Sequence, residues 1–323
     1  MKGTISTVLF VTAAIAIGIL RAAPTPANAL LVLEKAQNSL VIVEPVNLQI
    51  VARVPAGQNP HEVAVADDGM TAYISNYSGN TISRVDLTAQ KALPPVDLGA
   101  LRQPHGLEFV SGKLYFTAEG SKVVGRYDPV SQKVDWVIGT GQNRTHMVIA
   151  SKDFNTVLTS NISSSTISVI ENEGRDWAIT NIPVGHGSEG FDLTPDSKEL
   201  WVANAGDHTI SVIDMAEKKV FATLPSTNNA NRLKITRDGK YAFVSNLGGS
   251  GLLVIDVATR KPFKTIQTSG STEGLLMSPD GTHAYTTMND HDSVAVIDLK
   301  TFTITGEVKT GRGPDGLAWA ARR

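Results

Sequence analysis

The sequence predicts an all-β fold, a seven-bladed β-propeller made of four-stranded antiparallel blades. Three observations lead to this prediction: a repeat of about 42 residues along the chain, four short strands within each repeat, and partial repeats at the two ends that complement each other. A repeat of this length that contains four strands is typical of a propeller, because each repeat then forms a whole blade.

The clearest repeat covers residues 187–225. It contains four runs in which apolar and polar residues alternate, FDLT, LWVAN, TISVID and KVFATL, and turn residues separate the runs. This alternation predicts a four-stranded antiparallel meander. One such meander cannot bury an apolar face by itself, so copies of it must pack against one another.

The copies are evenly spaced. An acidic residue closes the third strand of each repeat and recurs every 42 or 43 residues, at Glu44, Asp86, Asp128, Glu171, Asp214, Asp256 and Asp298. No linker or low-complexity tract interrupts the series. We therefore expect residues 30–323 to form one propeller domain.

The two ends of the chain supply partial blades. Residues 30–54 hold three strand-like segments, LLVLE, SLVIVE and QIVARV, which match the second to fourth strands of a repeat, and residues 314–319 match a first strand. We expect the N-terminal strands to pair with the C-terminal strand in one sheet. This pairing would close the ring and remove its open edges.

Residues 1–29 predict a secretory signal peptide that is cleaved before Leu30. Lys2 is basic, residues 8–20 form an apolar run too short to span a bilayer comfortably, and residues 27–29 (Ala-Asn-Ala) fit the small-residue cleavage rule. An uncleaved membrane anchor is the alternative. With cleavage, we expect a periplasmic or extracellular monomer without a membrane span.

The composition excludes several classes of function. The formal net charge of −2 argues against nucleic-acid binding driven by bulk charge. The absence of cysteine excludes a lipoprotein, a disulfide scaffold, thiolate metal ligands and covalent c-type haem. No G-x-S-x-G elbow, phosphate-binding loop or HExxH motif occurs, so no local motif indicates catalysis.

Four stretches match different parts of one characteristic repeat: YISN at 73–76, IPVG at 182–185, SVID at 211–214 and LMSPDG at 276–281. The pattern resembles the YVTN-repeat family of secreted seven-bladed propellers, the YncE-like and surface-antigen-like proteins. The resemblance covers the mature chain and implies the fold. The architecture is also similar to that of lactonase-type propellers, haem d1 and nitrous-oxide reductase propellers and amine dehydrogenase subunits, so it does not determine a chemistry.

Differences between the repeats indicate a site at one mouth of the central channel. Alignment of the seven first strands gives one polar position, occupied by His61, His105, Thr145, Glu189, Asn231, Glu273 and Asp315. The first strand of a blade is innermost, so we expect these side chains to form a ring at the mouth. The alternative is that they only satisfy backbone groups and channel waters.

The next aligned position contains glycine in four blades and ionisable residues in three. It is occupied by Glu62, Gly106, His146, Gly190, Arg232, Gly274 and Gly316. We read glycine here as suited to a tight turn entry, and its replacement as a sign of a charged mouth. Drift in a tolerant loop is the alternative. Arg144 is an additional candidate for contact with an anion at the same mouth.

The histidines suggest a divalent metal as a candidate cofactor. His61, His105 and His146 would be its ligands, because imidazole with carboxylate suits Zn, Mn, Fe or Cu(II). A carboxylate-only set, drawn from residues such as Glu189, Glu273 and Asp315, would suit Ca²⁺. A ring too wide for a metal would fit a polar small molecule instead.

The sequence thus favours a non-catalytic binding or scaffold protein that uses its channel mouth to bind a protein or a small polar ligand. Near-uniform repeats without a local catalytic motif support this interpretation. A metal-assisted enzyme of the lactonase or lyase type is the alternative. An electron-transfer subunit is a third interpretation, and it would need non-covalent haem bound through His105 or His146.

Overall fold

The computed structural model describes residues 23–226 and 229–322. The predicted signal peptide, residues 1–29, lies largely outside the described residues. Helical structure in the described ranges consists of four 3₁₀ turns, η1 (Lys35–Gln37), η2 (Glu119–Ser121), η3 (Ile162–Ser164) and η4 (Asn289–His291). None of the described helices has the length and hydrophobicity to cross a membrane.

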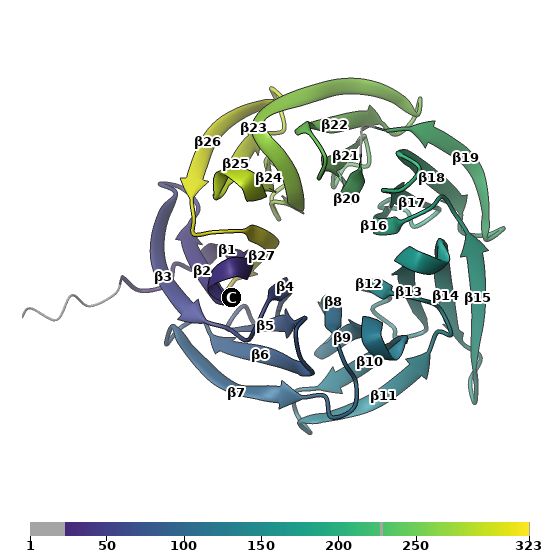
Figure 1. The fold of residues 1–323 in the computed structure, drawn as a ribbon, viewed down its shortest axis with the longest axis horizontal. Helices are drawn as coiled ribbons and strands as arrows, with labels where there is room; N and C mark the ends of the chain where they lie inside the picture. The colour runs from purple at the N-terminus through teal and green to yellow at the C-terminus, as the bar shows by residue number, and fades with distance from the viewer. Residues whose placement is uncertain (1–22, 227–228, 323) are drawn as a thin grey trace, which may run out of the picture.

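The strands form antiparallel sheets arranged around a ring (Figure 1). Blade one contains β4 (Pro60–Val65), β5 (Thr71–Asn76), β6 (Thr81–Asp86) and β7 (Lys91–Asp97), and blade two contains β8 (Pro104–Val110), β9 (Lys113–Ala118), β10 (Val123–Asp128) and β11 (Lys133–Gly139). Blade three contains β12 (Thr145–Ala150), β13 (Thr156–Asn161), β14 (Thr166–Asn172) and β15 (Trp177–Pro183). Blade four contains β16 (Ser188–Leu193), β17 (Glu199–Asn204), β18 (Thr209–Asp214) and β19 (Lys219–Pro225). The all-β propeller prediction is confirmed.

Blades five and six share one long strand, β23 (Lys261–Met277). Its first part is the outer strand of blade five and its second part is the inner strand of blade six. The other strands of these blades are β20 (Ala230–Ile235), β21 (Tyr241–Asn246) and β22 (Ser250–Asp256), then β24 (His283–Met288), β25 (Ser293–Asp298) and β26 (Thr303–Lys309). Figure 1 shows β23 as a continuous ribbon that curves between the two blades.

Blade seven combines the two ends of the chain. Its sheet order is β27 (Pro314–Ala321), β1 (Asn28–Glu34), β2 (Ser39–Glu44) and β3 (Gln49–Pro55). Leu30 pairs with Trp319 and Val32 with Leu317. The N-terminal strands therefore pair with the C-terminal strand, and no edge is left open between blades six and one. β1 begins at Asn28, two residues before the strand that the sequence predicts.

Alternate residues of a strand pack against the two neighbouring blades. In β2, Leu40 and Ile42 join a core with Ile74 of blade one, whereas Val41 and Val43 join a core with Tyr285 of blade six. These four β2 residues are fully buried. Period-two alternation here separates two buried faces, because every blade is covered on both sides.

The recurring acidic residue has a local role in the turn after the third strand. Asp86 Oδ1 accepts hydrogen bonds from the backbone N–H groups of Thr88 and Ala89, each at 2.8 Å. Asp214 does the same for Ala216 and Glu217, each at 2.9 Å. An acidic side chain that binds its own turn explains why the residue recurs. Glu171 is an exception, because it pairs with Lys218 and Asn172 Oδ1 accepts the turn N–H of Gly174.

A β-bulge occurs near the start of every first strand. In blade one the pairing passes from Pro60↔Asn76 to Val63↔Ile74, so two residues of β4 oppose the single Ser75. Corresponding shifts follow Pro104, Thr145, Ser188, Ala230, Thr272 and Pro314. A bulge redirects side chains out of the regular pleat, so the bulged residues form the inner wall of the ring.

Candidate functional site

The first bulged residue of each blade forms a polar ring. The register gives its members as His61, His105, His146, Glu189, Asn231, Glu273 and Asp315. The predicted member Thr145 is wrong, since Thr145 pairs with Asn161 as Pro60 pairs with Asn76. The loop before β12 has one extra residue, which places Arg144 rather than Asn143 in the left-handed conformation that Asn59 adopts.

The second bulged residue alternates between glycine and a larger side chain. Its members are Glu62, Gly106, Met147, Gly190, Arg232, Gly274 and Gly316. Two blades, rather than the predicted three, carry an ionisable residue here, because His146 belongs to the first position.

The glycines are explained by contact between blades rather than by a turn entry. A Cβ on Gly106 would lie 2.4 Å from the His146 carbonyl oxygen, and one on Gly274 would lie 2.1 Å from the Asp315 carbonyl oxygen. Each glycine thus makes room for the first strand of the next blade.

A second ring of residues, which the sequence analysis missed, follows the second strands. Its members are Lys35, Tyr77, Glu119, Ile162, Ala205, Leu247 and Asn289. They have the same spacing of 42 or 43 residues as the acidic residues that close the third strands. The same alignment applied to the ends of the second strands would have found them. We call the two rings together with Glu62, Arg144 and Arg232 the channel mouth.

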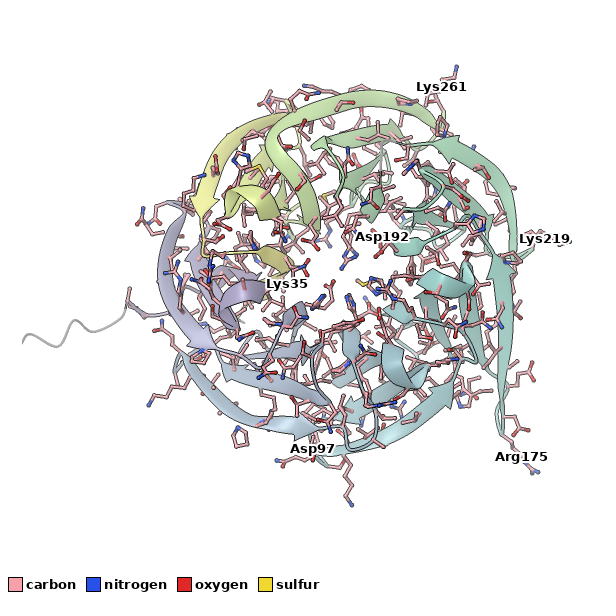
Figure 2. All side chains as sticks on the ribbon, in the orientation of Figure 1. Lys35, Asp97, Arg175, Asp192, Lys219 and Lys261 are labelled. Carbon is pink, nitrogen blue, oxygen red and sulfur yellow. The ribbon has the colours of Figure 1, made fainter. Side chains whose placement is uncertain are left out.

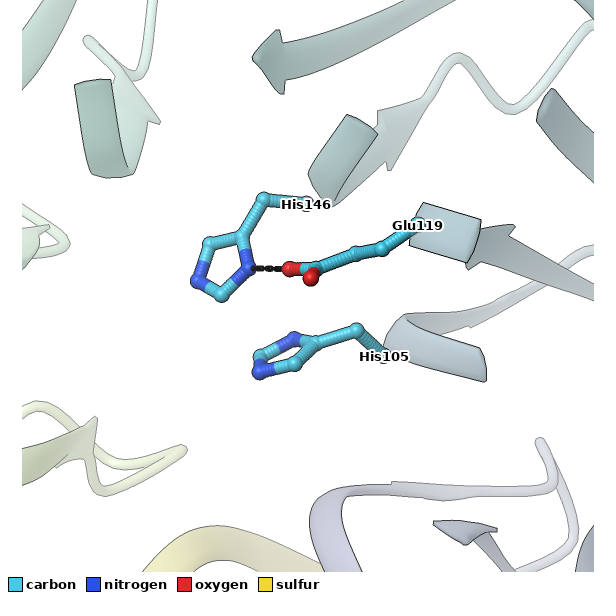
Figure 3. Close-up of side chains that lie close together, drawn as sticks. All are labelled: His105, Glu119 and His146. Carbon is cyan, nitrogen blue, oxygen red and sulfur yellow. Dashed lines mark hydrogen bonds and ion pairs between the residues drawn. The ribbon is translucent and has the colours of Figure 1, made fainter. Parts of the chain in front are cut away.

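Glu119 connects blade two to blade three. Its Oε1 lies 2.5 Å from His146 Nδ1. Figure 3 marks this contact with a dashed line. Glu119 Oε2 accepts a hydrogen bond of 2.7 Å from the Tyr77 hydroxyl and lies 3.3 Å from Arg144 Nε. Burial would raise the pKa of Glu119, but His146, Tyr77 and Arg144 outweigh it, and the pKa is lowered. Glu119 is therefore ionised, and Arg144 pairs with this carboxylate.

His146 lies between two carboxylates. Its Nε2 lies 2.9 Å from Glu189 Oε2, which is close enough for an ion pair, but the two atoms are not aligned for a hydrogen bond. Burial would lower the pKa of His146, but Glu189 and Glu119 raise it above its ordinary value. Burial would likewise raise the pKa of Glu189, yet His146 and Arg232 hold it at about 2.

Arg232 extends this chain of charges across the channel. Its Nη2 donates to Glu62 Oε1 at 2.6 Å, and its Nη1 lies 3.5 Å from Glu189 Oε2. Burial opposes the charged guanidinium, but Glu62, Asp315 and Glu189 raise its pKa. Blades four, five and one are therefore joined by alternating charges.

The rings of three histidines and a tyrosine lie in tilted and edge-on contact beside this chain. The ring centroids of His105 and His146 are 3.8 Å apart, those of His61 and His105 are 4.9 Å apart, and those of His61 and Tyr77 are 4.7 Å apart. His105 is 3% exposed and its Nδ1 has no hydrogen-bond partner. Burial and the neighbours His146 and His61 lower the pKa of His105 well below its ordinary value, so its ring is neutral.

A second group of charges lies in blades six and seven. Lys35 Nζ is 2.9 Å from Glu273 Oε1 and 3.1 Å from Asp315 Oδ2, and Asn289 Nδ2 donates to Glu273 Oε2 at 2.7 Å. Burial and the adjacent Asp315 raise the pKa of Glu273. Figure 2 places Lys35 toward the inside of the ring, whereas Lys219 and Lys261 lie at its outer rim.

Two cavities lie at or near the channel mouth. A cavity of about 170 Å³ is lined by second bulged residues, including Glu62, Met147 and Arg232. A larger pocket of about 640 Å³ lies between blades one and two and reaches the channel mouth at Tyr77 and Gly120. The ion pairs and ring contacts described above join the side chains of the mouth into two groups.

The predicted metal ligands are partly brought together. Within the described residues, the compact group of potential ligands is His105, Glu119 and His146, whose ligand atoms all lie within 4.8 Å of one another. His61, the third predicted ligand, is outside this group, and its Nδ1 lies 2.9 Å from the Asn59 carbonyl oxygen. Glu119 takes the place that the sequence analysis assigned to His61.

Solved structures with similar folds have diverse descriptions. A functionally unknown protein from Desulfotomaculum acetoxidans aligns with a TM-score of 0.77 and 13% identity over 92% of this chain and 100% of its own. Kuenenia stuttgartiensis hydrazine synthase aligns with a TM-score of 0.68 and 20% identity over 80% and 88%. Dihydro-heme d1 dehydrogenase NirN aligns with a TM-score of 0.66 and 19% identity over 91% and 65%. Likeness at such low identity shows the fold alone.

A search of the curated proteins found no match to this sequence. The model of the YncE-like β-propellers matches residues 96–280, which is more than half of the chain. The repeats, the sheets and this match agree, and the chain belongs to the YncE-like β-propeller family.

Proposed function

We propose that the protein is a binding protein whose channel mouth takes a small, positively charged ligand. The observation that carries this proposal is the balance of charge. Five carboxylates, Glu62, Glu119, Glu189, Glu273 and Asp315, face three permanent cations, Lys35, Arg144 and Arg232. His146 has a raised pKa: counted as a cation it leaves the mouth with one negative charge, and counted as neutral it leaves two. The mouth is negative in both protonation states and attracts a cation.

The mouth is also organised in advance. Ion pairs between blades hold its side chains in place, so little conformational entropy is lost when a ligand binds. Hydrogen-bonding capacity remains at Asp315, which is 1% exposed: its Oδ2 lies 3.1 Å from Lys35 Nζ, whereas its Oδ1 has no partner. A buried acceptor of this kind favours a ligand that brings N–H donors or a metal ion.

Calorimetric titration and thermal denaturation test the proposal. We expect putrescine or a divalent cation to stabilise the protein, by about 2.7 kcal/mol at a hundred times its dissociation constant. Citrate and phosphate should have no effect. Glu273→Gln should weaken putrescine binding, while the exposed Asp207→Asn should not. Stabilisation by citrate or phosphate alone would contradict the proposal.

A second candidate function is acid–base catalysis, including metal-assisted hydrolysis of a lactone. The observation that favours it is His146, held by Glu119 at one ring nitrogen and facing Glu189 at the other. A carboxylate that orients an imidazole is a common arrangement for a general base. We expect no turnover in a lactone screen. Hydrolysis that disappears in His146→Ala protein would favour the enzyme over the binding protein.

We further propose that the protein acts as a monomer in the periplasm or outside the cell, after removal of residues 1–29. The basic residue, the short apolar run and the Ala-Asn-Ala site of this segment support export. N-terminal sequencing of exported protein should give Leu30 as the first residue. Protein that keeps residues 1–29 and stays with the membrane would instead indicate an anchor.

A further inference from the structure

We propose that His105, Glu119 and His146 bind a divalent transition-metal ion such as Zn²⁺. This inference rests on the proposed function, because it names one class of cation for the channel mouth. The three residues are 3%, 5% and 3% exposed, and their ligand atoms lie within 4.8 Å of one another. β8 supplies His105, η2 supplies Glu119 and β12 supplies His146.

The donor atoms indicate the kind of metal. Two imidazoles and one carboxylate form the ligand set of zinc sites that keep one position open, with bonds of about 2.0–2.2 Å. Imidazole nitrogen also suits copper and nickel, whereas Ca²⁺ and Mg²⁺ prefer oxygen ligands throughout. We therefore expect transition metals to bind in preference to Ca²⁺ and Mg²⁺.

The ion would replace the proton that His146 Nδ1 and Glu119 Oε1 share. These atoms are 2.5 Å apart, whereas two ligands on one tetrahedral ion are roughly 3.3–3.6 Å apart, so a small side-chain rotation must open the pair. The His105 ring lies beside the same pair (Figure 3). Its buried Nδ1 has no partner and supplies the third donor.

The neighbours of these residues are suited to a metal site. Glu189 Oε2 lies 2.9 Å from His146 Nε2, so it can accept the second ring N–H and leave Nδ1 for the ion. Carboxylates commonly orient metal-binding histidines in this way. Tyr77 and Arg144 hold Glu119 Oε2, which leaves Oε1 free for the ion.

The charge of the mouth agrees with the charge of the ion. With neutral histidines the ionisable groups of the mouth sum to two negative charges, and a divalent ion brings this sum to zero. Burial of unpaired charge is costly, so a matched ion stabilises the site more than a monovalent one would.

The test is a calorimetric titration of chelator-stripped protein with Zn²⁺ alone. We expect one Zn²⁺ per chain and release of a proton, visible as a dependence of the enthalpy on the buffer. Glu119→Gln should weaken binding roughly 100-fold or more, and Glu189→Gln about 10-fold. The matched control is His186→Ala, which removes an exposed histidine that lies 2.9 Å from Asp207 and should bind as the wild type does.

Circular dichroism must show that each variant is folded. Should Glu119→Gln not fold, His105→Ala, which removes the ring with the unpartnered nitrogen, provides the same comparison. Absence of Zn²⁺ binding, or equal binding by the wild type and folded Glu119→Gln or His105→Ala, would overturn the metal site. Putrescine binding that depends on Glu273, without Zn²⁺ binding, would overturn the metal site and leave the proposed function standing. Binding of neither probe would overturn both.

Discussion

Arg232 shows how a single residue holds this mouth together. Its side chain is 10% exposed and pairs with Glu62 and Glu189, whose side chains are 13% and 17% exposed. A buried ion pair is not strongly stabilising in itself, but removal of one partner leaves the other charge without compensation. The consequence is a large, testable effect on stability.

We expect Arg232→Met to lower the free energy of unfolding by about 3 kcal/mol, because two nearly buried carboxylates would lose their cation. Urea denaturation at neutral pH measures the change. A second substitution, Glu62→Gln, should restore part of the loss. The matched control is Lys309→Met at an exposed pair with Glu307, which should cost less than about 1 kcal/mol. Equal effects of Arg232→Met and Lys309→Met would contradict the prediction.

Glu108 makes stability depend on pH. Burial raises its pKa to about 7 from an ordinary value of 4.5, although its side chain accepts a hydrogen bond from the Ala150 backbone. The folded protein thus holds a proton that the unfolded chain releases near pH 4.5, and the associated stability is lost as pH rises through about 7.

We expect Glu108→Gln to be as stable as the wild type near pH 4.5. Near pH 8.5 the variant should be more stable by about 2 kcal/mol, which is less than for a fully buried carboxyl because Glu108 is partly exposed. Denaturant midpoints measured across this pH range test the sign. A variant that is less stable than the wild type at pH 8.5 would show that the charged carboxylate is well accommodated.

Among the structural elements, the bulged first strand determines the site. Every blade contains the same bulge, so the residue at the first bulged position faces the mouth in every blade. The glycines at the second bulged position let neighbouring bulges approach closely. Site geometry and blade packing are therefore coupled at the same residues.

Gly274→Ala tests this coupling. The added Cβ would lie 2.1 Å from the Asp315 carbonyl oxygen, so the first strands of blades six and seven must move apart. We expect a loss of about 2–3 kcal/mol in the free energy of unfolding, together with weaker ligand binding at Glu273 and Asp315. Gly139→Ala is the control, since its Cβ would meet no atom within 4 Å. An unchanged midpoint in Gly274→Ala would show that the ring adapts without strain.

On the scale of the whole molecule, ring closure depends on the pairing of β27 with β1. A chain that ends at residue 313 would leave β1 as an open edge and remove the bulge that contributes Asp315. We expect this truncated chain to aggregate or to lose cooperative unfolding, as size-exclusion chromatography and thermal denaturation would show. Removal of residues 322 and 323 alone should be tolerated. A monomeric, cooperatively unfolding chain of residues 30–313 would contradict this role.

Part of the site was predictable from the repeats. Eight of its predicted residues, including His105 and Glu189, occupy the predicted positions because strand order places every first strand innermost. His146 was predicted as a site residue but assigned to the second position, whereas the register places it at the first. Tyr77 and Glu119 were missed, because only the starts of the first strands were compared.

The sequence by itself determined the fold, since the period of the repeat, the turn acids and the complementary ends are local patterns that recur in every blade. The pairing of the termini follows from the same patterns. Only the tertiary structure decided which polar residues meet. Glu119 and His146 belong to different blades, and no spacing in the sequence encodes the distance between blades. That distance depends on how closely the first strands pack, and the glycines of the neighbouring blades set it.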